Sequence, residues 1–142
     1  MLSLSIADTK TFMAKLLKSE CFDAFAFHSA VIHSFACFEI SKIPANEPST
    51  WQNMRHYAFE IIKGSALPKY IKIVLSKSGD IVGVPDTIFF VNVLYEDGCI
   101  NISTGVSQKT FSLDKSANIR WDEYVLNLLD GAGIEHSNRF VS

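Results

Sequence analysis

The amino-acid sequence predicts an α+β domain with a mainly antiparallel sheet of six to seven strands and three helices, in the order β-α-β-β-α-β-β-β-α. Three observations support this fold class. An Asp-Gly pair separates two strand-like segments, three other segments carry apolar residues at helical spacing, and several short segments alternate between apolar and polar residues. The chain is expected to form one domain over residues 1–142, with a polar tail at 134–142 that frays.

The clearest local signal is Asp97-Gly98, which predicts a two-residue type I′ turn because Asp tolerates positive φ and Gly adopts it freely. Counting outward from the turn gives the cross-strand pairs Glu96/Cys99, Tyr95/Ile100, Val93/Ile102 and Val91/Thr104. The predicted core face consists of Phe89, Val91, Val93, Tyr95, Ile100 and Ile102. The opposite face carries Ile88, Phe90 and Leu94 among polar residues, so we expect a helix or a second subunit to half cover it.

The N-terminal third begins with a short alternating segment, Leu2 to Ile6, that predicts a half-buried strand. Asp8 then offers an N-cap to a helix over Thr9–Lys18. The aromatic and β-branched residues that follow predict two strands, near Ala24–His33 and Phe35–Ser41, joined by a sharp corner.

The second helix is predicted from Ser49 and Gln52, which form a capping box, to Gly64 at its C-terminal end. A strand over Tyr70–Leu75 follows, and the Gly- and Pro-containing connection Ser76–Pro85 is expected to be the most mobile segment.

After the hairpin, Thr104–Phe111 predicts a bend or bulge and then an edge-like strand. A phosphate cradle is the alternative interpretation of this segment, although it lacks phosphate-loop spacing. Ser116 or Asn118 is expected to cap the last helix, which Gly131 ends.

Composition limits the classes of function. A formal net charge of −2 gives no electrostatic argument for nucleic acid as the default partner. The three cysteines, Cys21, Cys37 and Cys99, show no paired spacing, so we expect reduced thiols and a cytoplasmic location. No apolar run is long enough to predict a membrane span or an export signal. The sequence predicts no metal site and no cofactor, since His28 and His33 would point to opposite faces of one strand.

Several motifs resemble a family of small clostridial proteins without an assigned function. The most specific of them are Thr104–Ser116, read as T-G-x-S-x-K-x-F-x-L-D-K-S, and Trp121-Asp122-Glu123; Phe59–Gly64 adds to the resemblance. The resemblance implies a single bacterial domain with no known reaction, so no catalytic residue is carried over. It also implies a longer insertion at Ser76–Pro85, which this chain lacks; if that insertion carries the function, this member has lost it. The low-specificity candidates for ligand binding are the polar motif residues Thr104, Ser107, Lys109, Asp114, Lys115 and Asp122.

Three hypotheses of different classes follow. The first is a non-enzymatic binding or protein-interaction module that self-associates as a homo-oligomer through Ile88, Phe90 and Leu94. The second is a nucleic-acid-associated protein, because the element order is similar to one domain of a DNA sliding clamp; its candidate contacts are Lys10, Lys15, Lys18, Lys109, Lys115 and Arg120. The third is a small hydrolase or phosphate-ligand enzyme built around Ser107, Lys109, Asp114 and Asp122.

Overall fold

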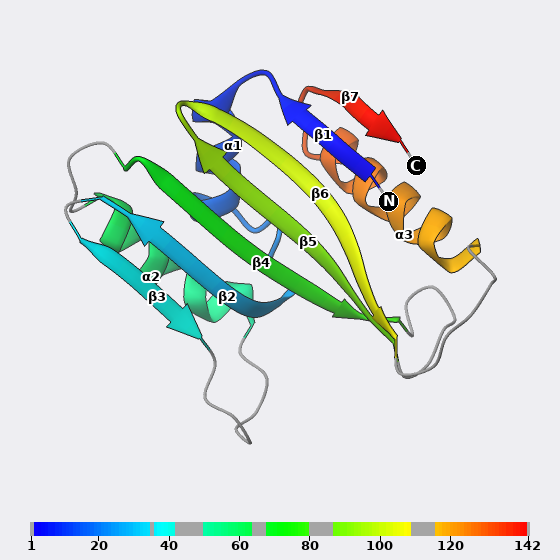
Figure 1. Cartoon of the computed structure of the whole chain (residues 1–142), viewed down its shortest axis with the longest axis horizontal. Helices are drawn as coiled ribbons and strands as arrows, with labels where there is room; N and C mark the ends of the chain where they lie inside the picture. Colours follow the sequence, from blue (N-terminus) through cyan, green and yellow to red (C-terminus); the bar gives the residue numbers. More distant parts are fainter. Residues whose placement is uncertain are drawn as a thin grey trace.

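The computed structural model describes residues 2–34, 36–41, 50–63, 68–79, 87–108 and 116–141, and only the backbone at 108 and 138–141. In chain order the elements are β1 (Leu2–Ile6), α1 (Thr9–Lys18), β2 (Ala26–His33), β3 (Cys37–Ser41), α2 (Trp51–Lys63), β4 (Tyr70–Ser78), β5 (Thr87–Glu96), β6 (Cys99–Gln108), α3 (Ser116–Gly131) and β7 (His136–Val141). The strands form a seven-stranded sheet in the order β3-β2-β4-β5-β6-β1-β7, and every neighbouring pair is antiparallel (Figure 1). The predicted α+β class and element order are confirmed, and β7 is a strand beyond that order.

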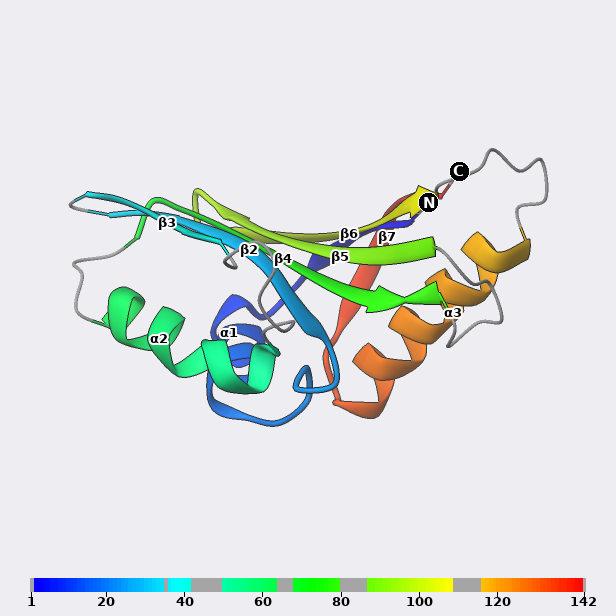
Figure 2. The same cartoon turned by 90° about the horizontal axis from the view of Figure 1, so that it is seen from below.

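The three described helices all lie on one face of the sheet (Figure 2). Helices α1 and α2 pack against each other below one end of the sheet, and α3 lies below the other end. No described helix covers the opposite face. The molecule therefore has two layers, with the hydrophobic core between the helices and the sheet.

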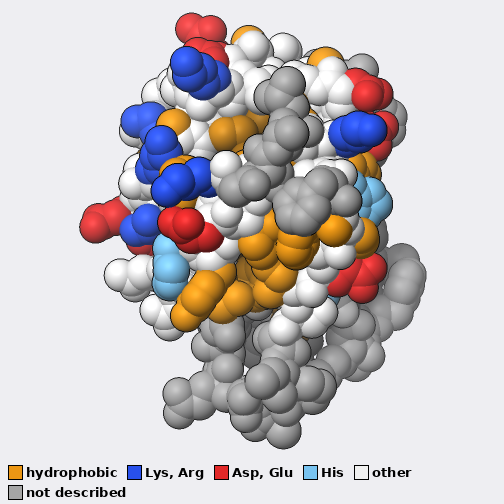
Figure 3. All heavy atoms as spheres, turned by 90° about the vertical axis from the view of Figure 1, so that its left-hand side faces the viewer, with side chains coloured by type: hydrophobic (Ala, Val, Ile, Leu, Met, Phe, Trp, Pro, Cys, Tyr) orange, Lys and Arg blue, Asp and Glu red, His pale blue; other side chains and the backbone are white. Residues whose placement is uncertain are grey.

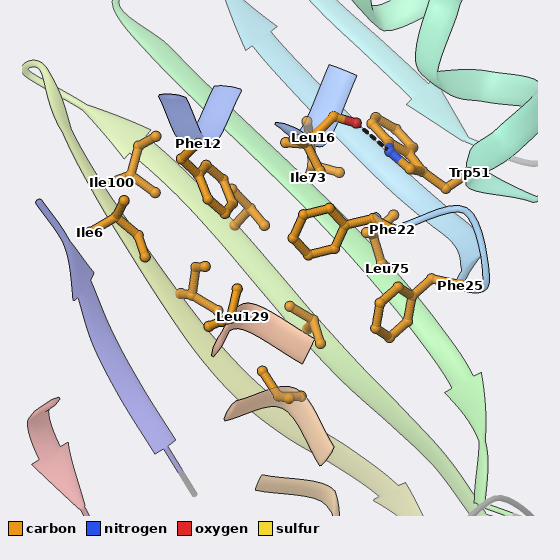
Figure 4. Close-up of a cluster of buried hydrophobic side chains, with 14 of the residues drawn as sticks. Ile6, Phe12, Leu16, Phe22, Phe25, Trp51, Ile73, Leu75, Ile100 and Leu129 are labelled. Atoms are coloured by element: carbon orange, nitrogen blue, oxygen red, sulfur yellow. Dashed lines mark hydrogen bonds between the residues drawn. The ribbon is translucent and has the colours of Figure 1, made fainter. Parts of the chain in front are cut away.

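Aromatic side chains fill the centre of the core. Phe22 lies between Phe12 and Phe25, with ring centroids 5.8 and 6.1 Å away, and Phe25 meets Trp121 edge to face at 6.1 Å. Figure 4 shows Phe12, Phe22 and Phe25 in front of the central strands of the sheet, together with the hydrogen bond from Trp51 to Leu16. Edge-to-face contacts of this kind add to the stabilisation from buried apolar area.

The hairpin has the predicted turn and register. Asp97 and Gly98 have φ values of 53° and 79°, as a type I′ turn requires. Glu96 lies opposite Cys99, and the other predicted pairs are all present. The predicted core face is buried apart from the half-buried Tyr95.

The bend predicted from Thr104 is wrong within the described residues. Strand β6 continues to Gln108, and its register with β5 runs without a shift from Glu96↔Cys99 to Thr87↔Gln108. Gly105 simply lies opposite Phe90 in the ladder. The hydroxyl and β-branched residues of this segment therefore extend the strand, because each has a partner on β5. The edge-like strand expected near Phe111 lies outside the described residues.

Helix α2 begins one residue later than the predicted capping box implies. The described cap is Thr50, whose Oγ1 accepts from the backbone N of Asn53 at 3.3 Å, while Ser49 lies outside the described residues. Trp51 fixes this start, because its side chain is fully buried and its backbone N donates to the carbonyl of Phe25 at 3.0 Å. Asn118, one of the two predicted caps of α3, lies inside the helix, which begins at Ser116.

Two strands differ in extent from the prediction. Strand β4 continues to Ser78, past the predicted end at Leu75, because β5 pairs with it throughout. Residues 136–141, in the tail expected to fray, form β7 along the second edge of β1. The buried Ile134, 5% exposed, anchors the chain just before this strand. Most of the connection expected to be mobile, residues 80–85, lies outside the described residues.

Candidate functional site

Thr104 and Asp122, two of the six ligand-binding candidates, lie together. The Thr104 side chain is buried; its Oγ1 donates to Oδ1 of Asp122 at 2.7 Å and accepts from the backbone N of Leu2 at 2.8 Å. These bonds join β6, α3 and the start of β1. Both hydrogen-bonding functions of the Thr104 hydroxyl are therefore satisfied inside the fold.

The other candidates do not join this pair. Ser107 is three residues from Thr104 on an unbroken strand, so its side chain points to the opposite face of the sheet, next to Ile88. Lys109, Asp114 and Lys115 lie outside the described residues. Ser107 and Asp122 are thus separated by the sheet itself.

The face of the sheet without helices carries the three interface candidates, Ile88, Phe90 and Leu94. Ile88 is 48% exposed, and the side chains of Phe90 and Leu94 are half-buried by their neighbours on the same face. The ring of His28 contacts Phe90 edge to face, with centroids 5.4 Å apart.

Charged residues are sparse over half of this face. Three successive rows of cross-strand neighbours on β4, β5 and β6 contain only apolar or neutral polar residues, and we call these rows the neutral patch. The rows are Val74-Asn92-Ser103, Ser76-Phe90-Gly105 and Ser78-Ile88-Ser107. Towards the turn, the next row contains Lys72 beside Leu94, and the following row contains Glu96. The patch therefore combines exposed apolar area with little local charge.

A second surface feature lies in the helix layer, where the sequence had indicated only the lysines of α1, as candidate nucleic-acid contacts. Helices α1 and α2 leave between them a groove of about 350 Å³, which we call the α1–α2 groove. Its apolar lining includes Met13 and Leu17 from α1 and Phe59 and Ile62 from α2, with Tyr95 reaching it from the end of β5. This volume is within the range of roughly 300–1,000 Å³ that small-molecule pockets occupy.

Three lysines surround the apolar lining: Lys10, Lys18 and Lys63. The Nζ atoms of Lys18 and Lys63 lie 5.2 and 5.9 Å from the ring centroid of Phe59. No described aspartate or glutamate lines the groove. Figure 3 shows most of the Lys and Arg side chains of this end on one half, with some Asp and Glu among them and exposed hydrophobic side chains beside them.

Hydrogen bonds fix α2 against the C-terminal end of α1. Trp51 Nε1 donates to the carbonyl of Leu16 at 2.9 Å. Arg55 forms two hydrogen bonds with the Asp23 carboxylate, at 2.9 and 3.3 Å, and a longer one with the carbonyl of Leu17 at 3.5 Å. A partly buried, bidentate pair of this type is more rigid than an exposed ion pair. Sequence analysis missed it, because no local pattern links two residues 32 positions apart.

The candidate nucleic-acid contacts do not form one described surface. Lys10, Lys15 and Lys18 belong to α1, whereas Arg120 belongs to α3 below the other end of the sheet (Figure 2). Lys109 and Lys115 are outside the described residues. The basic side chains that lie together are those of the α1–α2 groove, where Lys63 joins Lys10 and Lys18.

The remaining titratable groups have local roles. The side-chain and backbone hydrogen bonds from Thr11 lower the pKa of Asp8, the N-cap of α1. His136 Nε2 lies 2.9 Å from Oδ1 of Asp130, between β7 and α3. Among the described residues there is no group of His, Cys, Asp and Glu suited to a metal ion, and no helix long and apolar enough to span a membrane. The three cysteines are free thiols, and only Cys37 and Cys99 are exposed.

Comparison with known proteins gives one finding. Residues 15–137 match the model of a family described as a family of unknown function, DUF5721. No curated protein and no solved structure matches the chain. The expected membership of a family without an assigned function is confirmed, while the clostridial origin and the clamp-like arrangement stay predictions.

Proposed function

The chain belongs to DUF5721, a family of unknown function, and from its own surfaces we propose that it is a non-enzymatic binding module that self-associates through the open face of its sheet. One observation carries the proposal. The described helices all cover one face, and the other face presents Ile88, Phe90 and the rest of the neutral patch. An exposed apolar side chain beside a half-buried one on an uncovered sheet face, as with Ile88 and Phe90, favours an interface.

The size of the face is sufficient for a stable dimer. Strands β2, β4, β5 and β6 contain 8 to 10 residues each. At about 3.3 Å per residue and about 4.8 Å between strands, they give a surface of roughly 30 by 19 Å in projection. A standard interface buries about 800 Å² of accessible surface on each partner, and the accessible area of side chains exceeds their projected area.

The charge pattern favours a second copy as the partner. In a two-fold dimer the same patch faces itself, so any charge near the axis meets its own kind. The neutral patch has no charged side chain, and such an arrangement therefore has no repulsion to overcome there. A strongly charged partner would find no complementary group on the patch.

Ile88 provides the test. Complete burial of an isoleucine side chain contributes roughly 1.5–3 kcal/mol. Because 48% of Ile88 is exposed, its burial in both copies of a symmetric dimer contributes about 1.5–3 kcal/mol in total. Ile88→Asp should therefore raise the dimer dissociation constant at least tenfold, and like-charge repulsion should add to the effect.

The measurement is sedimentation equilibrium of the full chain over a concentration series. The proposal expects the wild type to approach twice the 15.8 kDa chain mass and Ile88→Asp to remain near the single mass. Ile119→Asp is the matched control, because Ile119 is 58% exposed but belongs to α3, on the other side of the sheet. A monomeric wild type, or an equal effect of both substitutions, would contradict self-association through this face. Phe90→Ser serves as a second variant if circular dichroism shows that Ile88→Asp does not fold.

Neither alternative function has a comparable observation in its favour. A nucleic-acid surface would need its basic residues together, but Arg120 is remote from Lys10 and Lys18. An enzyme built on Ser107 and Asp122 would need both at one site, but they belong to opposite sides of the sheet. Both hypotheses remain predictions with weaker support than the open face.

A further inference from the structure

The α1–α2 groove has three notable properties: an apolar lining, lysines but no described acidic residue among its lining, and two helices joined by hydrogen bonds. We propose that it is a binding site for an amphiphile with one hydrocarbon chain and an anionic head group. This site is independent of the open sheet face, since the groove is lined mainly by residues of α1 and α2, on the other side of the sheet.

Apart from its lysines, the lining offers a ligand only two hydrogen-bonding side chains, those of Thr9 and Tyr95, and Thr9 already donates to the carbonyl of Gly98. The apolar centre of the lining includes Met13, Ala14 and Phe59, which lie inside the two helices, so their backbone N–H and C=O groups already bond within each helix. An extended peptide would leave its own backbone groups unpaired against Met13, Leu17 and Ile62, at a considerable cost in free energy. A hydrocarbon chain has no such groups and gains from contact with the same atoms.

The dimensions also favour a single chain. An α-helix with its side chains is about 10–12 Å in diameter, so even two turns of a partner helix exceed the groove volume of about 350 Å³. Lys10 and Lys18 stand eight residues apart on α1, which places their Cα atoms about 12 Å apart along the helix axis at 1.5 Å per residue. An extended hydrocarbon chain is thin enough to lie between the two helices along this length.

The charges select the head group. Lys18 and Lys63 approach the ring of Phe59 from the two helices, and Lys10 lies farther along α1. Glu60 lies 4.0 Å from Lys63, but both side chains are largely exposed, so this pair leaves the ammonium accessible. The chain has a net charge of −2, and the concentration of lysines here is therefore local. A carboxylate or phosphate between Lys18 and Lys63 would bind two ammonium groups while its tail covers Phe59.

Hydrogen bonds between α1 and α2 hold the two sides of the groove together in the absence of a ligand. Trp51 and Arg55 fasten α2 to the carbonyls of Leu16 and Leu17 at the end of α1, and the Asp23 carboxylate holds the Arg55 side chain. Binding then requires little reorganisation of the groove, and this lowers the entropic cost.

The test is isothermal titration calorimetry of the full chain with dodecanoate, at concentrations below micelle formation. We expect saturable binding of one molecule per chain, together with amide shifts in α1 and α2 in ¹H–¹⁵N spectra. Dodecyl phosphate distinguishes a phosphate from a carboxylate head group. Dodecanol and dodecyltrimethylammonium should bind at least tenfold more weakly if the lysines select the head group.

Two variants locate the site. The double variant Lys18→Glu/Lys63→Glu should weaken dodecanoate binding at least tenfold, and Ala14→Trp should abolish it by filling the groove from the exposed Ala14. Lys72→Glu is the matched control on the open sheet face and should have no effect. Circular dichroism establishes that each variant folds.

Three results would overturn the proposal: no dodecanoate binding, equal binding of the cationic amphiphile, or equal loss in Lys72→Glu. Saturable binding of an acidic peptide without binding of dodecanoate would also overturn it and assign the groove to a protein partner. Because Ile88→Asp should leave amphiphile binding unchanged, failure of this proposal and failure of self-association are separate outcomes.

Discussion

Replacing Thr104 by valine should destabilise the fold strongly, although the two side chains have nearly the same shape. The substitution removes the hydroxyl that donates to Asp122 and accepts from the backbone N of Leu2. The buried backbone N of Leu2 would lose its acceptor, at a cost of about 1–3 kcal/mol, and the half-buried Asp122 carboxylate would lose one hydrogen bond, which adds about 1 kcal/mol. The expected loss in the free energy of unfolding is therefore roughly 2–4 kcal/mol, a large fraction of the total of about 5–15 kcal/mol typical of such domains.

Urea unfolding followed by tryptophan fluorescence measures this loss, because Trp51 and Trp121 are both fully buried and report on the core. The midpoint should fall with an unchanged m value, and Tm should decrease by roughly 6–12 °C. Ser107→Val on the same strand is the control; its side chain is exposed, so a change within about 0.5 kcal/mol is expected.

A double-mutant cycle with Asp122→Ala isolates the hydrogen bond itself. The bond between the two side chains should give a coupling free energy of about 1–2 kcal/mol. Strict additivity, or a Thr104→Val variant as stable as the wild type, would refute the assignment of Thr104 as a structural link between β1, β6 and α3. The chain would then have a spare buried hydroxyl, and a ligand role for Thr104 would regain support.

Two other predictions concern α1 and α2. Arg55→Ala leaves the partly buried Asp23 carboxylate without its partner and should lower the free energy of unfolding by about 2 kcal/mol. Arg55→Lys should recover only part of that loss, because Lys cannot form both bonds. Urea titration of both variants measures the two losses. Asp8 has a folded-state pKa below its ordinary value because Thr11 donates to its carboxylate, so its charge adds stability that is present above about pH 4 and is lost as pH falls through the lowered pKa. The stability difference between wild type and Asp8→Asn should accordingly be greatest at neutral pH and vanish in strong acid; a difference that grows on acidification would reverse the argument.

The parts of the fold that could be predicted are those that neighbouring residues determine. Asp97 and Gly98 fix the turn, and the turn fixes the register of every pair on β5 and β6. Asp8 identifies the start of α1 for the same reason, since an N-cap acts within one helical turn.

The parts that could not be predicted depend on partners distant in the sequence. The residues of β7 show no regular alternation, and the strand forms because β1 offers it an unpaired edge. The α1–α2 groove likewise requires knowledge of how two helices pack, which the apolar spacing of each helix does not contain. The structural role of Thr104, a ligand-binding candidate in the sequence, could not be predicted because its partner Asp122 is 18 residues away.

The position of β1 has a consequence for how the chain acquires its structure during synthesis. Leu2 bonds a residue 102 positions further along, so β1 stays without either neighbouring strand until nearly the whole domain has left the ribosome. At about 5–20 residues per second, that delay is roughly 5–20 s. During this delay, the apolar side chains of β1 lack their partners in the sheet and can associate with other nascent chains or with chaperones; they are those of Leu2, Leu4 and Ile6. The sheet is complete only after β6 and β7 have been synthesised, so its assembly is a late step in folding.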